Sequence, residues 1–200
     1  MNIVFDLGGV VFNWRPDAVI ASVFEDPVTQ ALVKAQIFQH PDWVELDRGT
    51  LDQDHAIVRG SSRTGLPRRD IERLFEAVPR SLTPITGTLD LIQAIRASTN
   101  RLFVLSNMSW ASISHLEREH KIWPLFDGTV ISCRTKKVKP EIDIYEFLLS
   151  EFRLQPAETV FIDDMHENLA AAASIGMKTI RFVDPVQCRR DLVELEVIDE

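Results

Sequence analysis

Five short apolar runs constrain the fold of this chain more than any other feature of the sequence. They are residues 3–5, 102–105, 130–131, 160–162 and 179–183. Their residues are mostly β-branched or aromatic and do not alternate with polar ones, which is typical of strands in a parallel sheet buried on both faces. Between the later runs, apolar residues recur at helical spacing around Leu89, Ile144 and Leu169. This alternation of strands and helices predicts an α/β fold with a doubly wound parallel sheet.

The long stretch between the first and second runs does not follow this alternation. Residues 15–83 contain no convincing buried strand, and prolines divide them into short pieces. Helical periodicity is found within residues 18–24, 28–38 and 71–78. We therefore expect a small helical cap at 15–83, inserted into a core made of residues 1–14 and 84–200. The alternative is that these helices simply form the first crossover connection between strands of the sheet. The number of helices alone would not distinguish a cap from such a crossover.

Charge and composition narrow the range of partners. The composition, 45% hydrophobic and 26% charged, is that of an ordinary globular protein. A net charge of -8 argues against nucleic acid or an anionic membrane as partner, because both favour a basic face. No apolar run approaches a membrane span, the N-terminus lacks the basic region of a signal peptide, and Cys133 and Cys188 have no metal-ligand spacing. We expect a cytoplasmic protein with free thiols; the sequence specifies no oligomeric state.

Polar residues stand where the predicted strands end. They are Asp6 after the first run, Ser106 and Asn107 after the second, Lys139 at the start of the helix after the third, and Asp163 and Asp164 after the fourth. Each alone has an ordinary explanation as a turn residue, helix cap or surface side chain. Ligands bind at the carboxyl ends of the strands in an open parallel sheet, however, and two adjacent acids there are difficult to explain without a cation. Together these residues predict a functional site.

The residue types suit phosphoryl transfer. A carboxylate such as Asp6 can attack phosphorus and form an acyl-phosphate, which divides one difficult step into two. Because the attacked group is a dianion, Mg²⁺ held by Asp6 and Asp164 would remove the charge repulsion. Lys139 adds positive charge, and the Ser106 hydroxyl can hold a phosphate oxygen. The glycines after Asp6 let the backbone approach closely and free the Gly8 carbonyl to bind the metal.

Four short motifs also occur together, in an order and at separations that one known family shares. They are Phe5-Asp6-Leu7-Gly8-Gly9-Val10-Val11, Leu105-Ser106-Asn107, Lys139-Pro140-Glu141 followed by Ile144-Tyr145, and Phe161-Ile162-Asp163-Asp164 with Asn168 and Ala171-Ala172. Each motif is weak alone, but the ordered set resembles the haloacid dehalogenase superfamily. The resemblance covers the whole chain, with residues 15–83 matching the small helical cap inserted after the first motif.

The resemblance implies a Rossmann-like core and magnesium-dependent hydrolysis of a small-molecule phosphate ester. It implies Asp6 and Lys139 as catalytic residues, Gly8, Ser106 and Asn107 as substrate-binding residues, and Asp6, Gly8, Asp164 and Asp163 as magnesium ligands. The sequence spacing from the acid pair to Asn168 aligns Asp164 with the family's main metal-binding position. It aligns Asp163 with a neighbouring position that can bind the metal through water.

The sequence departs from the family pattern at Gly8. Most phosphatases of the family carry a second aspartate there, which protonates the leaving group and later activates water. A branch similar to this sequence has glycine at that position and includes phosphatases of sugar 1-phosphates. We therefore expect a sugar phosphate as substrate, and a rate that falls steeply as the leaving group becomes more basic unless water or a cap residue supplies the proton.

Two other functions stay open at this stage. Asp6 could displace halide from a 2-haloacid, but family dehalogenases carry tyrosine at the position of Gly8. That reaction also needs no magnesium, so the acid pair at 163–164 would be a liability for it. The chain could also be a non-catalytic regulator that binds phosphate or metal, since a fold does not determine a function. Magnesium-dependent turnover of p-nitrophenyl phosphate would distinguish all three.

Four residues in the predicted cap could reach a substrate: His40, Trp43, Asp47 and Arg48. The pattern is more typical of a helix with one core aromatic residue and a solvated polar face. We therefore leave these residues out of the predicted site.

Overall fold

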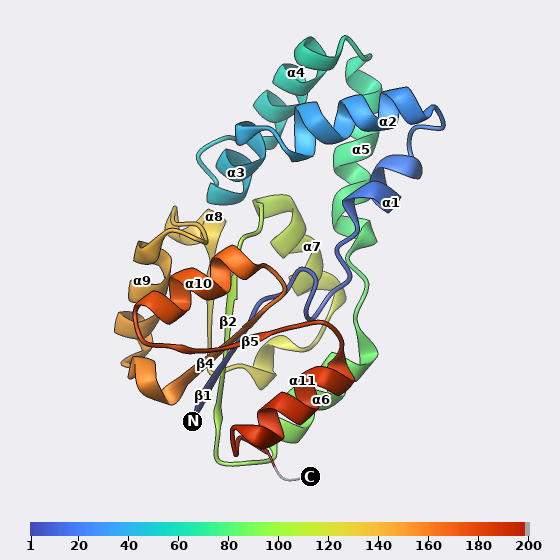
Figure 1. Cartoon of the computed structure of the whole chain (residues 1–200). Helices are drawn as coiled ribbons and strands as arrows, with labels where there is room; N and C mark the ends of the chain where they lie inside the picture. Colours follow the sequence, from blue (N-terminus) through green and yellow to red (C-terminus); the bar gives the residue numbers. More distant parts are fainter. Residues whose placement is uncertain (199–200) are drawn as a thin grey trace.

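The computed structural model describes residues 1–198, and the strands in that range form one parallel sheet (Figure 1). The strands are β1 (Asn2–Phe5), β2 (Arg101–Ser106), β3 (Gly128–Ile131), β4 (Thr159–Asp163) and β5 (Lys178–Arg181). Within the described chain their order is β3-β2-β1-β4-β5, so the chain winds outward from β1 to β3 and then returns to the other side of β1. This order confirms the predicted doubly wound sheet.

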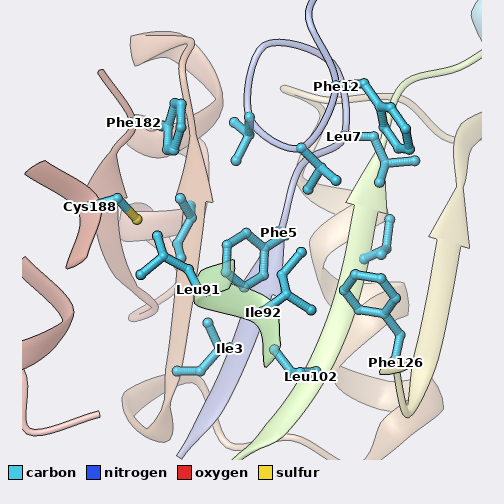
Figure 2. Close-up of a cluster of buried hydrophobic side chains, with 14 of the residues drawn as sticks. Ile3, Phe5, Leu7, Phe12, Leu91, Ile92, Leu102, Phe126, Phe182 and Cys188 are labelled. Carbon is cyan, nitrogen blue, oxygen red and sulfur yellow. The ribbon is translucent and has the colours of Figure 1, made fainter. Parts of the chain in front are cut away.

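Helices cover both faces of the sheet (Figure 1). One face packs against α6 (Thr86–Arg96), α7 (Trp110–Glu119) and α11 (Pro185–Glu194), and the other against α9 (Ile142–Phe152) and α10 (His166–Ser174). Ile3 and Phe5 enter the first of these two cores, which Figure 2 shows, and Val4 enters the second. Because both faces are buried, successive residues of β1 are all apolar, which explains the lack of alternation in the sequence.

Short elements complete the core of the fold. They are α8 (Ser132–Thr135) and two 3-10 turns, η2 (Trp123–Leu125) and η3 (Pro156–Glu158). Helix α10 is followed by a glycine cap: Gly176 adopts a φ of 88°, and the N–H of Met177 donates to the carbonyl of Ala172 at 3.2 Å. A glycine with positive φ just after a helix is a common C-terminal cap.

The chain between β1 and β2 is helical. It contains α1 (Pro16–Ala21), α2 (Pro27–Val33), the π-helical turn η1 (Lys34–Phe38), α3 (Pro41–Arg48), α4 (Gln53–Thr64) and α5 (Arg68–Ser81). These helices gather at one end of the molecule (Figure 1). Residues such as Val33, Ile57 and Leu74 form an apolar cluster of their own. Periodicity did not predict α4, which has few apolar residues. Its N-cap does mark it, since the Asp52 carboxylate accepts from the N–H of His55 at 2.9 Å.

Other expectations from composition concern membranes and thiols. Among residues 1–198 there is no helix both long and apolar enough to cross a membrane. Cys133 and Cys188 are free and buried, and burial raises the pKa of their thiols to about 11 and about 12. Neither thiol is therefore ionised near neutral pH.

Candidate active site

Three carboxylates meet where β1 and β4 end. Asp6 follows β1, Asp163 is the last residue of β4, and Asp164 comes next. Asp6, Asp163 and Asp164 each offer an oxygen, and these oxygens all lie within 4.8 Å of one another. Neighbouring parallel strands end at one edge of the sheet, so the position of these acids follows from the strand order. Carboxylate oxygens at this spacing are the donor set that Mg²⁺ prefers, and the cluster fits a metal site.

A cavity of about 440 Å³ opens above this cluster. Of the residues predicted from the sequence, its lining includes Asp6, Gly8, Asn107, Lys139 and Asp164. A larger hollow of about 580 Å³ lies between α1 and α5, but none of the predicted site residues line it. The 440 Å³ cavity is therefore the candidate active site.

Asp163 is completely buried, and contacts from three residues use both of its oxygens. Lys139 Nζ donates to Asp163 Oδ2 at 2.6 Å, the Met165 N–H donates to Oδ1 at 2.8 Å, and Asn168 Nδ2 lies 3.0 and 3.1 Å from the two oxygens. A buried carboxylate needs such partners to stay charged. These contacts hold Lys139 in place, and a metal-binding role for Asp163 stays a prediction.

Lys139 bridges two acids from different strands. Its Nζ lies 2.9 Å from Asp6 Oδ1 and 2.6 Å from Asp163 Oδ2, and only 4% of the residue is exposed. Burial by itself lowers the pKa of Lys139, but the charges of Asp6 and Asp163 outweigh this effect and raise the pKa above its usual value. An ammonium group has three donors, and two are used here, which leaves one for a substrate oxygen.

The other two acids of the cluster, Asp6 and Asp164, differ in how far they are buried. Burial and the charge of Asp163 raise the pKa of Asp6 to about 7 against the opposing effect of Lys139, and the Leu7 N–H donates to Asp6 Oδ1 at 2.7 Å. Asp164 is only partly buried and lines the cavity beside Asp6; burial and Asp163 also raise its pKa. A divalent cation at these oxygens would reverse both shifts by favouring the ionised forms.

Ser106 at the end of β2 carries a polar group without a partner. The Ser106 residue is 1% exposed, and within residues 1–198 its Oγ completes no hydrogen bond, although it lies near enough to Asp6 to lower the pKa of that acid slightly. Buried hydroxyl groups are nearly always paired, so an exception beside Asp6 needs a reason. A phosphate oxygen bound beside Asp6 would supply the missing partner.

The Asn107 side chain has a different position from the one expected of a substrate ligand. Its Oδ1 accepts from the Lys139 N–H at 2.8 Å, and its Nδ2 donates to the Lys139 carbonyl at 2.9 Å. Both ends of the carboxamide are thus engaged with the Lys139 backbone. The contacts support a positioning role for Asn107, while substrate binding by Asn107 stays a prediction.

Gly9 lets Asp164 approach the loop after β1. A Cβ atom at Gly9 would lie 2.6 Å from Asp164 Oδ2, and the residue has a φ of 81°. We expect Gly9→Ala to displace Asp164 and to weaken Mg²⁺ binding by about 10- to 100-fold, as changes that misplace a metal ligand do. Gly8→Ala is the matched control, because the nearest atom to its Cβ would be Trp14 Cβ at 3.7 Å. Calorimetric titration with Mg²⁺ measures both, and equal affinities would contradict the prediction.

The helical segment also contributes to the cavity. Trp43 and Asp47 of α3 line it, so the expectation of a solvated polar face is wrong for Asp47. Their spacing is the sequence signal that could have identified this, since residues four apart share one face of a helix. The neighbouring residues have structural contacts: His40 caps α3, and Arg48 forms a two-bond ion pair with Glu141 at 2.6 and 2.7 Å.

Comparison with known proteins shows relatives over the whole length of the chain. A sesquiterpene phosphatase of Aspergillus oryzae is 28% identical over 192 residues, which cover 96% of this chain and 94% of that protein. A D-ribitol-5-phosphate phosphatase of Bacteroides thetaiotaomicron is 25% identical over 205 residues, 96% of each chain.

Solved structures share the fold. A haloacid dehalogenase family enzyme from Bacteroides thetaiotaomicron, crystallised with magnesium and inorganic phosphate, superposes with a TM-score of 0.69 at 22% identity, over 92% of this chain and 94% of that one. The family model described as haloacid dehalogenase-like hydrolase matches residues 46–182, more than two thirds of the sequence. From the extent of that match, the chain belongs to the haloacid dehalogenase-like hydrolase family.

Proposed function

We propose that the protein is a phosphatase that hydrolyses small phosphomonoesters with Mg²⁺ as cofactor, through an aspartyl-phosphate on Asp6. The observation that carries the proposal is the cluster of Asp6, Asp163 and Asp164, whose oxygens lie within 4.8 Å of one another, with Asp6 and Asp164 lining the cavity. The unpaired Ser106 hydroxyl beside it supports a phosphate site. The names of the two full-length relatives, both phosphatases, point to the same chemistry.

Each of the site residues has a different role in this reaction. Asp6 attacks phosphorus as a carboxylate and later leaves again when water attacks the aspartyl-phosphate. Lys139, charged and fixed by Asp163, lies 2.9 Å from Asp6 and offers its remaining donor to a phosphoryl oxygen. Ser106 donates its hydroxyl to another. Mg²⁺ bound by Asp6, Asp164 and the Gly8 carbonyl would neutralise the negative charge that otherwise repels the nucleophile.

The helical segment serves as a cap in this proposal, with boundaries at residues 15 and 83. It has its own apolar cluster, yet α3 touches the core: Arg48 pairs with Glu141, and Lys136 Nζ donates to the Gly49 carbonyl at 2.5 Å. Since Trp43 and Asp47 line the cavity, the cap would help to exclude water from the reaction.

A sugar phosphate, as the sequence suggests, is our proposal for the substrate. The cavity lining includes six apolar side chains: Trp14, Trp43, Val78, Leu82, Met108 and Met165. The rings of Trp14 and Trp43 stack at 6.1 Å with an interplanar angle of 18°. These side chains suit the flat apolar face of a small leaving group. A phosphomonoester panel should contain sugar 1-phosphates, sugar 6-phosphates, an alditol phosphate and an isoprenoid phosphate.

Turnover of p-nitrophenyl phosphate with and without Mg²⁺ tests the proposed function. We expect activity only with Mg²⁺, and Asp164→Asn should raise the Mg²⁺ concentration needed far more than Asp163→Asn. We expect this ranking because Mg²⁺ can reach Asp164, which lines the cavity, whereas the oxygens of Asp163 are already bound by protein donors. Metal titration against rate in both variants gives the ranking.

Each outcome has a distinct meaning. Absence of magnesium-dependent turnover on the whole panel would refute the phosphatase proposal, and halide release from a 2-haloacid would support the dehalogenase alternative. The reverse ranking of the two variants would show that Asp163 is the principal metal ligand and that the motif is misaligned.

A further inference from the structure

The cavity holds a carboxylate that the proposed mechanism does not yet use. Gly8 leaves the site without an acid two residues after the nucleophile, although departure of an alkoxide from phosphorus benefits from a proton donor. Asp47, at the end of α3, lines the same cavity as Asp6 and is only partly exposed. A carboxylate from the helical segment thus lines the same cavity as the nucleophile, near enough for the charge of Asp6 to raise its pKa.

Hydrogen bonds fix Asp47 to the core next to the phosphate-binding loop. The completely buried Ser132 hydroxyl donates to the Asp47 carbonyl at 2.6 Å and accepts from the Met108 N–H at 2.8 Å. Met108 lies two residues after Ser106, so one hydroxyl ties Asp47 to the loop that follows β2. On the next residue, Arg48 forms its ion pair with Glu141. These contacts hold the backbone of Asp47 at a defined position, and the Ser109 N–H is placed to donate to the Asp47 carboxyl group.

The surroundings of Asp47 favour a carboxyl group that can carry a proton. Burial raises the pKa of Asp47 to about 7; the charge of Asp6 adds to the rise, and the Ser109 N–H and the Lys139 charge oppose it. Burial raises the pKa of the nearby Cys133 thiol, and the charge of Asp47 adds to the rise, so that thiol stays neutral. A donor whose pKa lies near the working pH is well matched to proton transfer.

Other acids in the cavity are less suitable. Asp6 and Asp164 belong to the nucleophile and metal cluster. Glu167 also lines the cavity, but it is exposed at the first turn of α10 and no hydrogen bond to its carboxylate is recorded among the described residues. Within residues 1–198, Asp47 is thus the acid that combines cavity access with fixed placement.

We propose that Asp47 is the general acid and base of the reaction and replaces the acid that is absent at Gly8; this rests on the proposed phosphatase function. In the first step, an Asp6 oxygen bonds to phosphorus, the phosphorus–oxygen bond to the leaving group breaks, and the proton of Asp47 passes to the leaving oxygen. The alcohol departs and Asp47 becomes a carboxylate. In the second step, Asp47 takes a proton from the water that attacks phosphorus, the Asp6–phosphorus bond breaks, and Asp6 is released as a carboxylate with inorganic phosphate.

The test compares native protein with Asp47→Asn on phosphomonoesters of graded leaving-group pKa, with Mg²⁺ present. The amide matches the protonated carboxyl in shape and charge but has no acidic proton to give. For alkyl phosphates we expect kcat/KM to fall by about 10²- to 10⁴-fold. For p-nitrophenyl phosphate the first step should change by less than about tenfold, because the transition state is loose and nitrophenolate leaves without a proton.

The second step gives an independent signature. Without its base, Asp47→Asn should accumulate the aspartyl-phosphate and show a burst of one nitrophenolate per enzyme before slow turnover. Asp54→Asn is the matched control: it removes a carboxylate from an exposed position on α4, outside the cavity, and should behave as native protein. Gly8→Asp added to Asp47→Asn should restore part of the alkyl phosphate activity, since a Cβ at Gly8 has room.

Several results would overturn the proposal. Asp47 would only support the structure if Asp47→Asn showed no burst and kcat/KM depended on leaving-group pKa as in the native protein. An equal loss of kcat/KM on all substrates would lead to the same conclusion. If kcat/KM of the native protein already fell steeply with rising leaving-group pKa, no proton donor would operate. The native protein alone gives this result. The same signature in Glu167→Gln instead of Asp47→Asn would assign the role to Glu167. Failure of the native protein to hydrolyse any phosphomonoester would instead refute the phosphatase function itself.

Discussion

Replacing Asp6 with asparagine is expected to abolish turnover and leave the protein folded. The amide keeps the shape of the side chain but lacks the negative charge that attacks phosphorus, so kcat should fall on the order of 10⁴-fold or more, as it does when a covalent nucleophile is removed. Asp163 is not free to replace Asp6, because its oxygens are bound to Lys139 and Asn168. Single-turnover assays on fresh protein, with mass spectrometry to exclude deamidation, measure the loss.

The stability of this variant is informative as well. Burial raises the pKa of Asp6 from 3.8 to about 7, so in metal-free protein the ionised carboxylate is destabilising, and stability falls as the pH rises between those two values. A neutral amide removes this dependence. We therefore expect metal-free Asp6→Asn to unfold at pH 8 at a temperature no lower than native protein does. Turnover near the native level would exclude Asp6 as the nucleophile.

Lys139→Ala is expected to damage both catalysis and stability. The variant leaves Asp6 and Asp163 buried beside each other without their shared cation, and removal of one partner from a buried ion pair costs about 3–5 kcal/mol of unfolding free energy. Loss of a preorganised charge at the phosphoryl group should lower kcat by about 10²- to 10³-fold. Chemical denaturation and steady-state kinetics measure the two effects separately.

Matched variants separate charge from packing at Lys139. Lys139→Met keeps the length of the side chain over the Phe161 ring, from which Nζ lies 5.3 Å, and should lose as much activity as the alanine variant. Addition of Asp163→Asn to Lys139→Met should recover part of the stability, since one unpaired carboxylate is removed. Lys137→Ala breaks a partly exposed pair with Asp143 at 2.7 Å and should cost at most about 1 kcal/mol. A retained kcat in Lys139→Ala with a small rise in KM would make Lys139 an ordinary binding residue.

Much of the fold could be predicted because its signals are local. Non-alternating apolar runs follow directly from burial of both sheet faces, and the observed strands lie within two residues of each predicted run. Helix α4 was missed because few of its residues are buried and its periodicity is weak, although the Asp52 cap was readable. The limits of the helical segment as a cap, and the roles of the individual site residues, stay proposals.

The sequence by itself determined the sheet, the family resemblance and the edge at which Asp6, Asp163 and Asp164 meet, because residues that follow neighbouring parallel strands must share one edge. Only the tertiary structure decided how the side chains are paired. The Asn107 amide lies against the Lys139 backbone, Asp47 lines the cavity, and its main-chain carbonyl accepts from Ser132, 85 residues away in the chain. Such contacts depend on how the helical segment packs on the core, and no periodicity or spacing within a single element encodes that arrangement.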